Sequence, residues 1–384
     1  MAENKKSKRK AASSALELIF LKANKLDKEG ADVIHLEVGD PYKPTPDRIK
    51  QAAKKAIDCN RVFYTPASGS EDLKKAIIEK YRRKQCKICI KEVVASHGSR
   101  PVISGVLKVL AGKGDKIFIP APYYPSFLGL SKQNGAQAVL IDTSEHGFKL
   151  SADELQNKID KFGVPKALIL NSPNNPSGVE YDKFEMKKIC ALARKYDFWI
   201  ISDECYQSFS KDKHFTMRQI HPDAIIIDSC SKEYSMTGWR IGWGIMPEEL
   251  AIKVKKYLGL FVSSLCAISE AAAIEAFKKD GVYNYEAQKN IICDWLDDKK
   301  RINYIRPEGG LYVFPDFSNY LNSRNGPQNS LALSEFLLEK SQVAIAPGIA
   351  FGDYDTYLRF CFCVRKDRLR EALQRIEINL VKKQ

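Results

Sequence analysis

Lys232 is the residue whose setting first suggests chemistry, because it lies between two apolar segments. AIIID (224–228) precedes it and IGWGIM (241–246) follows it, with Arg240 eight residues further along the chain. A lysine in such a setting is either a structural residue or a reactive amine. A free lysine has a pKa of about 10.4, so a reactive one needs a site that favours the neutral amine or an imine.

Clusters of polar residues follow four short apolar segments, at the points where strands would end. Asp203 and Tyr206 follow FWIIS, Asn175 follows ALIL within NSPNNPSG, Ser229 and Lys232 follow AIIID, and Gly98, Ser99 and Arg100 follow EVVAS. If these strands are parallel, the clusters gather at one edge of the sheet, where such sheets bind ligands.

Together these groups suit a phosphorylated aldehyde that contains a ring nitrogen. Lys232 would be the nucleophile that holds the aldehyde as a Schiff base. Asp203 would keep the ring nitrogen protonated, which makes the ring a better electron sink. Tyr206 and Asn175 would hydrogen-bond to a phenolic oxygen on the ring.

Several donors could bind the phosphate of such a compound. Gly98 and Ser99 would offer backbone N–H groups at a helix start, and Pro101 suits the first helical turn. Ser229 would add a hydroxyl, and Arg240 would make a bidentate contact from the opposite end of the molecule to Lys232.

Each of these residues also has a purely structural explanation. Asp203 could cap a helix, and Asn175 could belong to a turn. Arg240 could form an ion pair, and Tyr206 could be part of the core. The combination of four clusters with complementary chemistry favours a binding pocket.

The elements that would position these side chains alternate between apolar strands and helices. Helical periodicity fits residues 101–114 and 184–197. This pattern predicts an α/β large domain with a mostly parallel sheet sandwiched by helices. The strand segments are EVVAS, KIFIP, AVLI, ALILN, FWIIS, AIIIDS and IGWGIM.

The pattern changes after about residue 285, where GGLYVFPDF, QVAIAPG, YLRFCFCV and a terminal amphipathic helix predict a smaller α+β domain. We predict that it is built from both ends of the chain. The expected division is a basic disordered leader (1–12), an N-terminal segment packing on the small domain (13–48), the large cofactor-binding domain (49–285) and the small C-terminal domain (286–384).

The composition narrows the choice of partners. The net charge is +14, but basic residues are dense only at 5–10, so we expect small anionic substrates and no nucleic acid. No apolar segment approaches the roughly 18 residues of a membrane helix, and residues 1–10 lack a secretory signal's apolar segment, which predicts a cytoplasmic protein without membrane contact.

The ten cysteines include one lone CxxC, Cys86 and Cys89, without a second pair or His cluster at zinc spacing, so we expect reduced thiols and no metal site.

With these motifs in view, the chain resembles the class I/II aminotransferases of the fold-type I pyridoxal-phosphate enzymes, of the aspartate aminotransferase-like kind. The resemblance covers nearly the whole chain after the leader. It implies the cofactor pyridoxal 5′-phosphate and a ping-pong transfer of an amino group between an α-amino acid and a 2-oxo acid through a Lys232 Schiff base. Lys232 would also carry the proton between the substrate Cα and the cofactor C4′. The matching blocks are SKEYSMTGWRIGW, NSPNNPSG, SDECY, VGDPYKPTP, FYTPASGSEDLKKAI, PAPYYPSF, PEGGLYVFPDF, APGIAFG and YLRFCF.

The resemblance implies further roles that spacing does not indicate. Tyr124 would stack on the cofactor ring. Tyr64 would reach the phosphate of the neighbouring subunit, in a homodimer with shared active sites. Arg359 would bind the substrate α-carboxylate, helped by Asn175 and the backbone at Gly39.

The chain departs from the family pattern at several positions, which leave the substrate open. Arg100 stands in HGSRP, where it would add an anion contact or face solvent, and Glu270 stands where relatives often have glutamine. Ala11 and Ala12 occupy the place of a basic residue that aspartate-preferring members often carry. A lyase or synthase of the same fold, such as a β-C–S lyase or an aminocyclopropane-carboxylate-synthase-like enzyme, is the alternative.

Overall fold

A seven-stranded sheet forms the centre of the computed structural model, which describes residues 2–212, 215–281, 283–321 and 326–381. The strand order is β2-β8-β7-β6-β5-β3-β4. β8 is antiparallel to both of its neighbours, and the other pairings are parallel, so the predicted mostly parallel sheet is confirmed. The strands are β2 (Val93–Ser96), β3 (Lys116–Ala121), β4 (Gln137–Asp142), β5 (Ala167–Asn171), β6 (Trp199–Asp203), β7 (Ile225–Ser229) and β8 (Gly242–Ile245).

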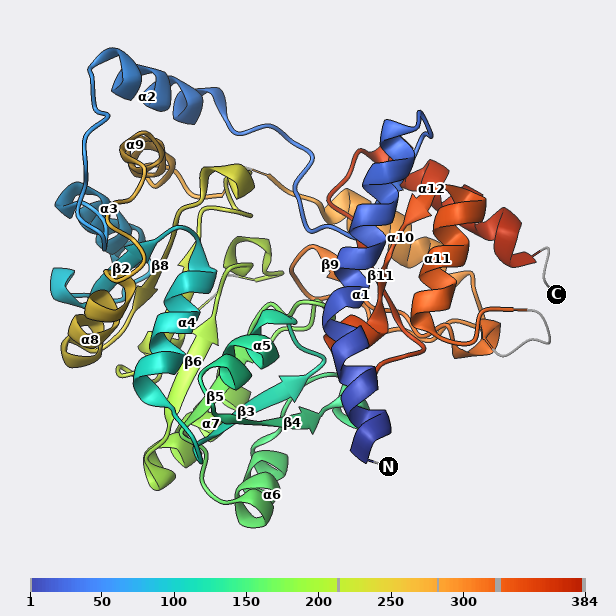
Figure 1. The fold of residues 1–384 in the computed structure, drawn as a ribbon, viewed down its shortest axis with the longest axis horizontal. Helices are drawn as coiled ribbons and strands as arrows, with labels where there is room; N and C mark the ends of the chain where they lie inside the picture. Colours follow the sequence, from blue (N-terminus) through green and yellow to red (C-terminus); the bar gives the residue numbers. More distant parts are fainter. Residues whose placement is uncertain (1, 213–214, 282, 322–325, 382–384) are drawn as a thin grey trace.

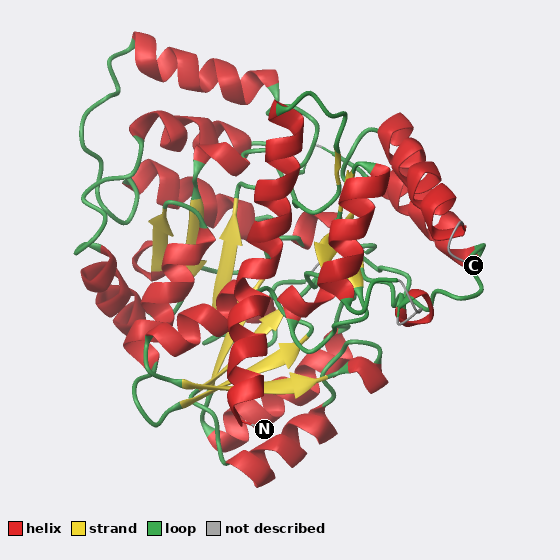
Figure 2. Cartoon of the chain, turned by 45° about the vertical axis from the view of Figure 1, so that its right-hand side comes forward, coloured by secondary structure: helices red, strands yellow, loops and turns green. Residues whose placement is uncertain are grey.

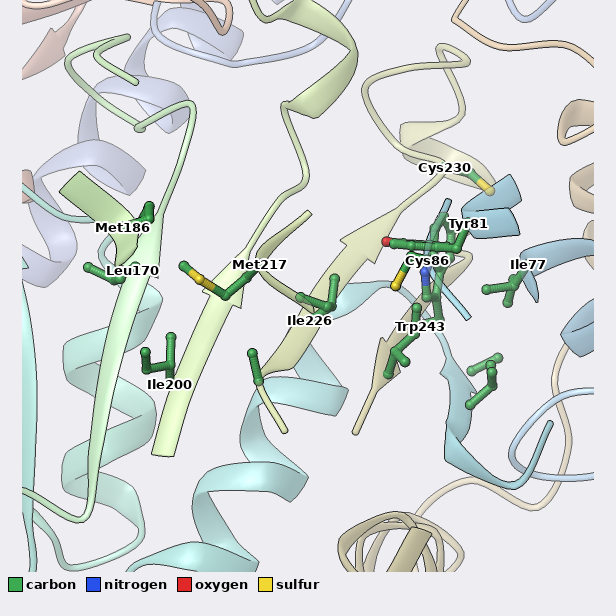
Figure 3. Packing of buried hydrophobic residues seen from close by; sticks show 14 of the residues in the cluster. Ile77, Tyr81, Cys86, Leu170, Met186, Ile200, Met217, Ile226, Cys230 and Trp243 are labelled. Atoms are coloured by element: carbon green, nitrogen blue, oxygen red, sulfur yellow. The ribbon is translucent and has the colours of Figure 1, made fainter. Parts of the chain in front are cut away.

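The central strands are apolar throughout because both faces of the sheet are covered. Leu170, Ile200 and Ile226, on neighbouring strands, belong to one core cluster (Figure 3). Their chain neighbours Ile169 and Ile201 point to the opposite face and belong to a second cluster. This alternation with period 2 explains why the strand segments read as continuous apolar runs in the sequence.

Helices lie on both faces of this sheet (Figure 2). Asp182 begins one of them, because its side chain accepts hydrogen bonds from Phe184 N and Glu185 N in a capping box. The helices are α2 (Asp47–Asp58), α3 (Glu71–Arg82), α4 (Ser99–Leu110), α5 (Ser126–Gln133), α6 (Ala152–Phe162), α7 (Lys183–Tyr196), α8 (Glu248–Leu258) and α9 (Ala267–Ala276). α4 and α7 correspond to the two segments in which the sequence predicted helices.

The C-terminal part contains shorter strands that also involve the N-terminal segment. β1 (Ile34–His35) pairs in parallel with β10 (Val343–Ala344). β12 (Leu358–Cys361) pairs antiparallel with β11 (Ala346–Pro347) and β9 (Tyr312–Val313), and the helices are α10 (Glu286–Asp297), α11 (Ser330–Ser341) and α12 (Lys366–Val381). The two ends of the chain therefore share this part, while the exact domain boundaries stay a prediction.

α1 (Ala2–Lys28) spans most of residues 1–12, the segment for which the sequence analysis expects a disordered leader. The helix extends back to Ala2, and Met1 lies outside the described residues. Lysine, arginine and alanine all have good helix propensity, so the leader continues the helix that follows it. Ile19 and Ala23 anchor α1 by packing against Leu338 and Ala344. The helix runs along the boundary between the large sheet and the C-terminal strands (Figure 1).

Two features of the described ranges bear on possible partners of the protein, a membrane and a metal ion. None of the helices there offers a span that is both long and apolar enough to cross a bilayer. In the same ranges, His, Cys, Asp and Glu side chains form no group of three or more that could hold a metal ion.

Candidate active site

A cavity of about 950 Å³ opens at the carboxyl-end edge of the large sheet. Side chains from α1, from the sheet edge and from the C-terminal part line it together. The predicted site residues that line it are Gly39, Ser99, Arg100, Tyr124, Asn175, Asp203, Tyr206, Ser229, Lys232, Arg240 and Arg359. Segments far apart in the sequence therefore meet at one place, as the strand-end argument requires.

The topology of the sheet explains this meeting. Asn171 and Asp203 are register partners at the ends of β5 and β6. Ser96 and Ser229 both pair with Gly242, the first residue of β8. Because β8 is antiparallel, it begins at the edge where the other strands end.

Lys232 lies in the turn after β7, with its amine toward the segment before α2. Its Nζ donates a hydrogen bond to the backbone oxygen of Gly39 at 2.5 Å. The flanking residues Cys230 and Tyr234 are fully buried, which anchors the turn on both sides of the lysine. The amine therefore lines the cavity from a well-packed base.

Asp203 is a buried acid at the end of β6. Burial raises the pKa of its carboxyl to about 6, with hydrogen bonds from Cys205 acting in the opposite direction. The Cys205 N–H donates to Oδ1 at 3.2 Å, and no ion pair reaches the carboxylate within the described ranges. A buried carboxylate without a cation is suited to a ligand that brings its own positive N–H group.

Tyr206, Asn175 and Arg359 form a hydrogen-bonded chain along the cavity. Asn175 Nδ2 donates to the Tyr206 hydroxyl at 3.3 Å, while Arg359 Nη1 donates to Asn175 Oδ1 at 2.9 Å. The Tyr206 and Tyr312 hydroxyls are 2.9 Å apart. Burial raises the pKa of the Tyr206 phenol, so this hydroxyl stays protonated and can donate.

Arg359 is a buried guanidinium with hydrogen-bonding capacity to spare. Its Nη2 donates to the backbone oxygen of Glu37. The guanidinium carbon of Arg359 lies 4.4 Å from the ring centroid of Tyr312 and 4.7 Å from that of Phe351. Nε is buried and has no hydrogen-bond partner in the described part of the chain. A carboxylate ligand would supply both the missing acceptor and the missing charge.

Arg240 occupies a left-handed backbone conformation, with φ of 59°, directly before β8. Its Nη1 donates to the Thr237 carbonyl at 2.7 Å and its Nη2 donates to the His97 carbonyl at 3.3 Å. Gly98 has a φ of 87°, which favours glycine, and its missing Cβ leaves room for Nη2, which would lie 2.3 Å from a Cβ at this position. The guanidinium is thereby held against the N-terminus of α4.

The N-terminus of α4 completes a place suited to an anion. Ser99 is the first helical residue, and Gly98 stands at the cap with φ of 87°. Ser229 lines the cavity beside these residues, as does Arg240. The Gly98 N–H donates to the Ser96 carbonyl at 2.8 Å, so the expectation that this group would bind the anion does not hold. The first-turn N–H groups from Ser99 onward, a hydroxyl and a guanidinium together fit a phosphate group.

The remaining predicted residues lie in the cavity wall, next to the cavity or outside it. Arg100 Nη2 donates to the Tyr124 hydroxyl at 2.5 Å, so both residues belong to the cavity wall. Gly98 stands next to the cavity, beside Arg240. Tyr64 is 90% exposed and lies outside the cavity of its own chain.

Some residues of the cavity were not singled out from the sequence. Asn171 ends β5 and accepts the Asn175 N–H at 2.7 Å, and the strand-end argument could have identified it. A Cβ at Gly39 would come within 1.8 Å of the Tyr312 hydroxyl, a packing relation that no local pattern records. Leu16 and Phe20 of α1 line the cavity as well. Only the docking of α1 reveals their position.

Comparison with known proteins agrees with this geometry. The family model for aminotransferases of class I and II matches residues 31–376. The chain belongs to the class I and II aminotransferases. Relatives of this aminotransferase include a probable aspartate/prephenate aminotransferase of Aquifex aeolicus, 35% identical over 94% of each chain, and an aspartate aminotransferase of Pyrococcus horikoshii, 32% identical over 95% of this chain and 94% of the relative. The structure of an aspartate aminotransferase from Thermotoga maritima matches with a TM-score of 0.88 and 30% identity, covering 97% of this chain and 99% of that chain.

The aminotransferase is thus an enzyme that moves an amino group between an α-amino acid and a 2-oxo acid. The resemblance inferred from its motifs is confirmed. Its family depends on pyridoxal phosphate, and the groups around the cavity fit that compound, since a buried acid, an anion site and a lysine amine all face the same space.

Proposed function

We propose that this aminotransferase binds pyridoxal 5′-phosphate in the cavity, with Lys232 joined to the aldehyde carbon. One observation carries the proposal. Asp203, Arg240, Arg359 and the Lys232 amine come from four separate segments and line a single cavity. Each supplies a different group that the cofactor or an amino acid needs.

When bound, the cofactor supplies an electron-withdrawing ring that acidifies the Cα–H bond of the attached amino acid. Asp203 holds the proton on the ring nitrogen by charge pairing, which its burial strengthens. The Lys232 amine, which lines the cavity, would carry the proton between the substrate Cα and the cofactor C4′. A second substrate, a 2-oxo acid, reverses these proton movements in a ping-pong cycle.

The remaining groups orient the reactants. Tyr206 and Asn175 donate hydrogen bonds to the phenolic oxygen of the ring. Ser229, Arg240 and the N-terminus of α4 hold the phosphate, with Ser99 giving a backbone N–H group; the Gly98 N–H donates to the Ser96 carbonyl at 2.8 Å instead. Tyr124 packs on the ring, since it lines the cavity and is braced by Phe127 at a centroid distance of 5.5 Å.

Arg359 binds the α-carboxylate of the amino acid, together with Asn175 and the backbone at Gly39. This role fits its buried guanidinium and its unpartnered Nε. For the side chain of the substrate, we propose a dicarboxylic acid, because relatives are named for aspartate and prephenate and Arg100 adds a positive charge to the cavity wall.

A cytoplasmic homodimer is the final part of this proposal. All ten cysteines are free, as a reducing compartment allows. Val62, Phe63 and Tyr64 are exposed, and so are Leu260 and Phe261. These two segments lie close together, since Thr65 N donates to Ser264 Oγ at 2.8 Å. Such an apolar surface suits a second copy of the chain, whose Tyr64 would reach the phosphate.

A half-reaction experiment tests the activity and the lysine together. Aspartate alone, added to the protein loaded with pyridoxal 5′-phosphate, should convert the visible absorption to that of the pyridoxamine form and yield one equivalent of oxaloacetate. Lys232→Ala should lack the absorption of the lysine-bound cofactor. Release of pyruvate and ammonia from amino acids, with the cofactor spectrum unchanged, would instead establish the lyase alternative.

A further inference from the structure

A buried polar network lies directly behind the cavity. Its members are chain neighbours of cavity residues: Glu233 follows Lys232, Asp228 precedes Ser229, and Gln207 follows Tyr206. Each neighbour is buried and directs its side chain into the network, which is centred on Lys80 of α3. We call Lys80, Gln207, Asp228 and Glu233 the rear network.

Lys80 and Glu233 are its central pair. Both are nearly inaccessible to solvent, and their side chains form an ion pair through Nζ and Oε2. Glu233 Oε1 accepts the Gly281 N–H at 3.0 Å, so both carboxylate oxygens are engaged. The residue after Lys232 is therefore bound to α3 on one side and to the segment between α9 and α10 on the other.

Asp228 links this pair to the ends of β6 and β7. Its Oδ2 lies 3.6 Å from Lys80 Nζ and accepts the Gln207 amide N–H at 2.5 Å. Its Oδ1 accepts the Ser229 N–H at 2.7 Å. The positions of Lys232, Ser229 and Tyr206 are thus coupled through hydrogen bonds that never enter the cavity.

Aromatic rings surround the Lys80 ammonium. Its ammonium lies 5.3 Å from the Tyr234 ring centroid, 5.4 Å from that of Trp243 and 5.8 Å from that of Phe277. Figure 3 shows Trp243 and Tyr81 packed together in this region. Desolvation opposes the charge on Lys80, yet Glu233 and the other acidic groups keep its pKa raised. A buried ion pair adds little net stability over apolar residues of similar size, so its geometric constraint is the effect to examine.

We propose that Glu233 and Lys80 are positioning residues for Lys232, fixing the direction of its amine toward the cofactor and the substrate Cα. This inference rests on the proposed role of Lys232. The proposed proton transfer depends on the position of the Lys232 amine, so a small displacement of the turn would slow it while leaving the Arg359 site intact.

Glu233→Gln tests the proposal by three measurements on the full-length protein. The value of kcat should fall about tenfold while KM for the amino acid changes less than about twofold, because orientation and not binding is lost. Reaction of the cofactor-free protein with pyridoxal 5′-phosphate, followed by visible absorption and borohydride trapping on Lys232, should slow by a similar factor. The melting temperature reports any purely structural loss.

Two further variants separate positioning from stability. Glu92→Gln breaks the ion pair with Arg218, at 2.6 Å and also largely buried, and should lower the melting temperature without changing either rate. Lys80→Met with Glu233→Met removes both members of the central pair, and Asp228 keeps its hydrogen bonds from Gln207 and the Ser229 N–H, so the double variant should fold and still react slowly. This variant is the test to use if Glu233→Gln does not fold. Wild-type rates in the double variant, or rate losses no larger than those of Glu92→Gln, would overturn the proposal. A wild-type protein that gains no visible absorption would instead overturn the proposed function.

Discussion

At the scale of single residues, the ionisation of Asp203 depends on whether a ligand occupies the cavity. Its carboxyl is buried, and no cation of the described residues pairs with it, so its charged form is disfavoured until a positive ligand binds. The cofactor-free enzyme therefore carries a destabilising feature at neutral pH. This is expected at a binding site, because the ligand later supplies the missing charge.

The pH dependence of folding in the cofactor-free protein should reveal this feature. The pKa of Asp203 is about 6 in the folded state against 3.8 for an unperturbed aspartate, so the folded state binds more protons between these values. The stabilising contribution of the protonated acid is complete below pH 3.8 and is lost as pH rises through about 6. The difference between the two pKa values corresponds to about 3 kcal/mol.

Asp203→Asn should remove this dependence. Relative to wild type, the variant should gain up to about 3 kcal/mol in the free energy of unfolding between about pH 4 and about pH 7, measured by urea titration without cofactor. The exposed Asp223→Asn is the matched control and should show no such trend. If the free energy of unfolding differs between the wild type and Asp203→Asn by the same amount at every pH, the burial argument is contradicted.

At the scale of elements, α1 has two functions, and each is carried by a different side of the helix. Ile19 and Ala23 are buried against α11 and β10 and hold the helix in place. Leu16 and Phe20 line the cavity on another side. A helix anchored in this way can form part of the substrate wall, although it lies outside the large sheet.

Phe20→Ala should therefore change substrate preference. The ring is 41% exposed, so its loss should cost about 1 kcal/mol of contact with a bulky substrate, or about fivefold in kcat/KM for phenylalanine relative to alanine. Leu21→Ala is the control, because Leu21 is 58% exposed on the same helix and does not line the cavity. Equal effects of both changes on the two amino acids would rule out the wall function.

At the scale of the whole molecule, Tyr64 is a cavity residue only if a second copy is present. In a single chain its side chain projects into solvent among other exposed apolar residues. Under the proposed homodimer, each cavity is completed by the partner, so neither Tyr64→Ala nor Lys232→Ala homodimers should be fully active.

Mixing these two variants tests the shared site. Hybrid dimers contain one cavity with both Lys232 and the partner's Tyr64 intact. After subunit exchange, random pairing should restore about a quarter of the wild-type activity. An activity no greater than the sum of the separate variants would show that Tyr64 does not act across subunits.

Much of the fold and of the site follows from local patterns. The apolar runs predict the strands, and the residues after them predict the positions of Lys232, Asp203 and Asn175, because side-chain period and strand length are local properties. The bounds of α1 did not follow from the sequence, since charge density and helix propensity favour different outcomes over residues 1–12. The sequence also did not determine whether β8 runs parallel or antiparallel to its neighbours. Its connection to β7 holds only 12 residues without an α-helix, which suits an antiparallel neighbour.

The sequence by itself thus determined the strands, the order of the motifs and the chemical groups available for catalysis. Only the tertiary structure decided which groups meet. It brought Arg240 to the sheet edge through the reversed β8, placed Tyr312 under Arg359, and set Phe20 of α1 at the cavity. These contacts join segments far apart in the chain, and the packing of one element on another depends on all of their surfaces together, which no single stretch of residues encodes.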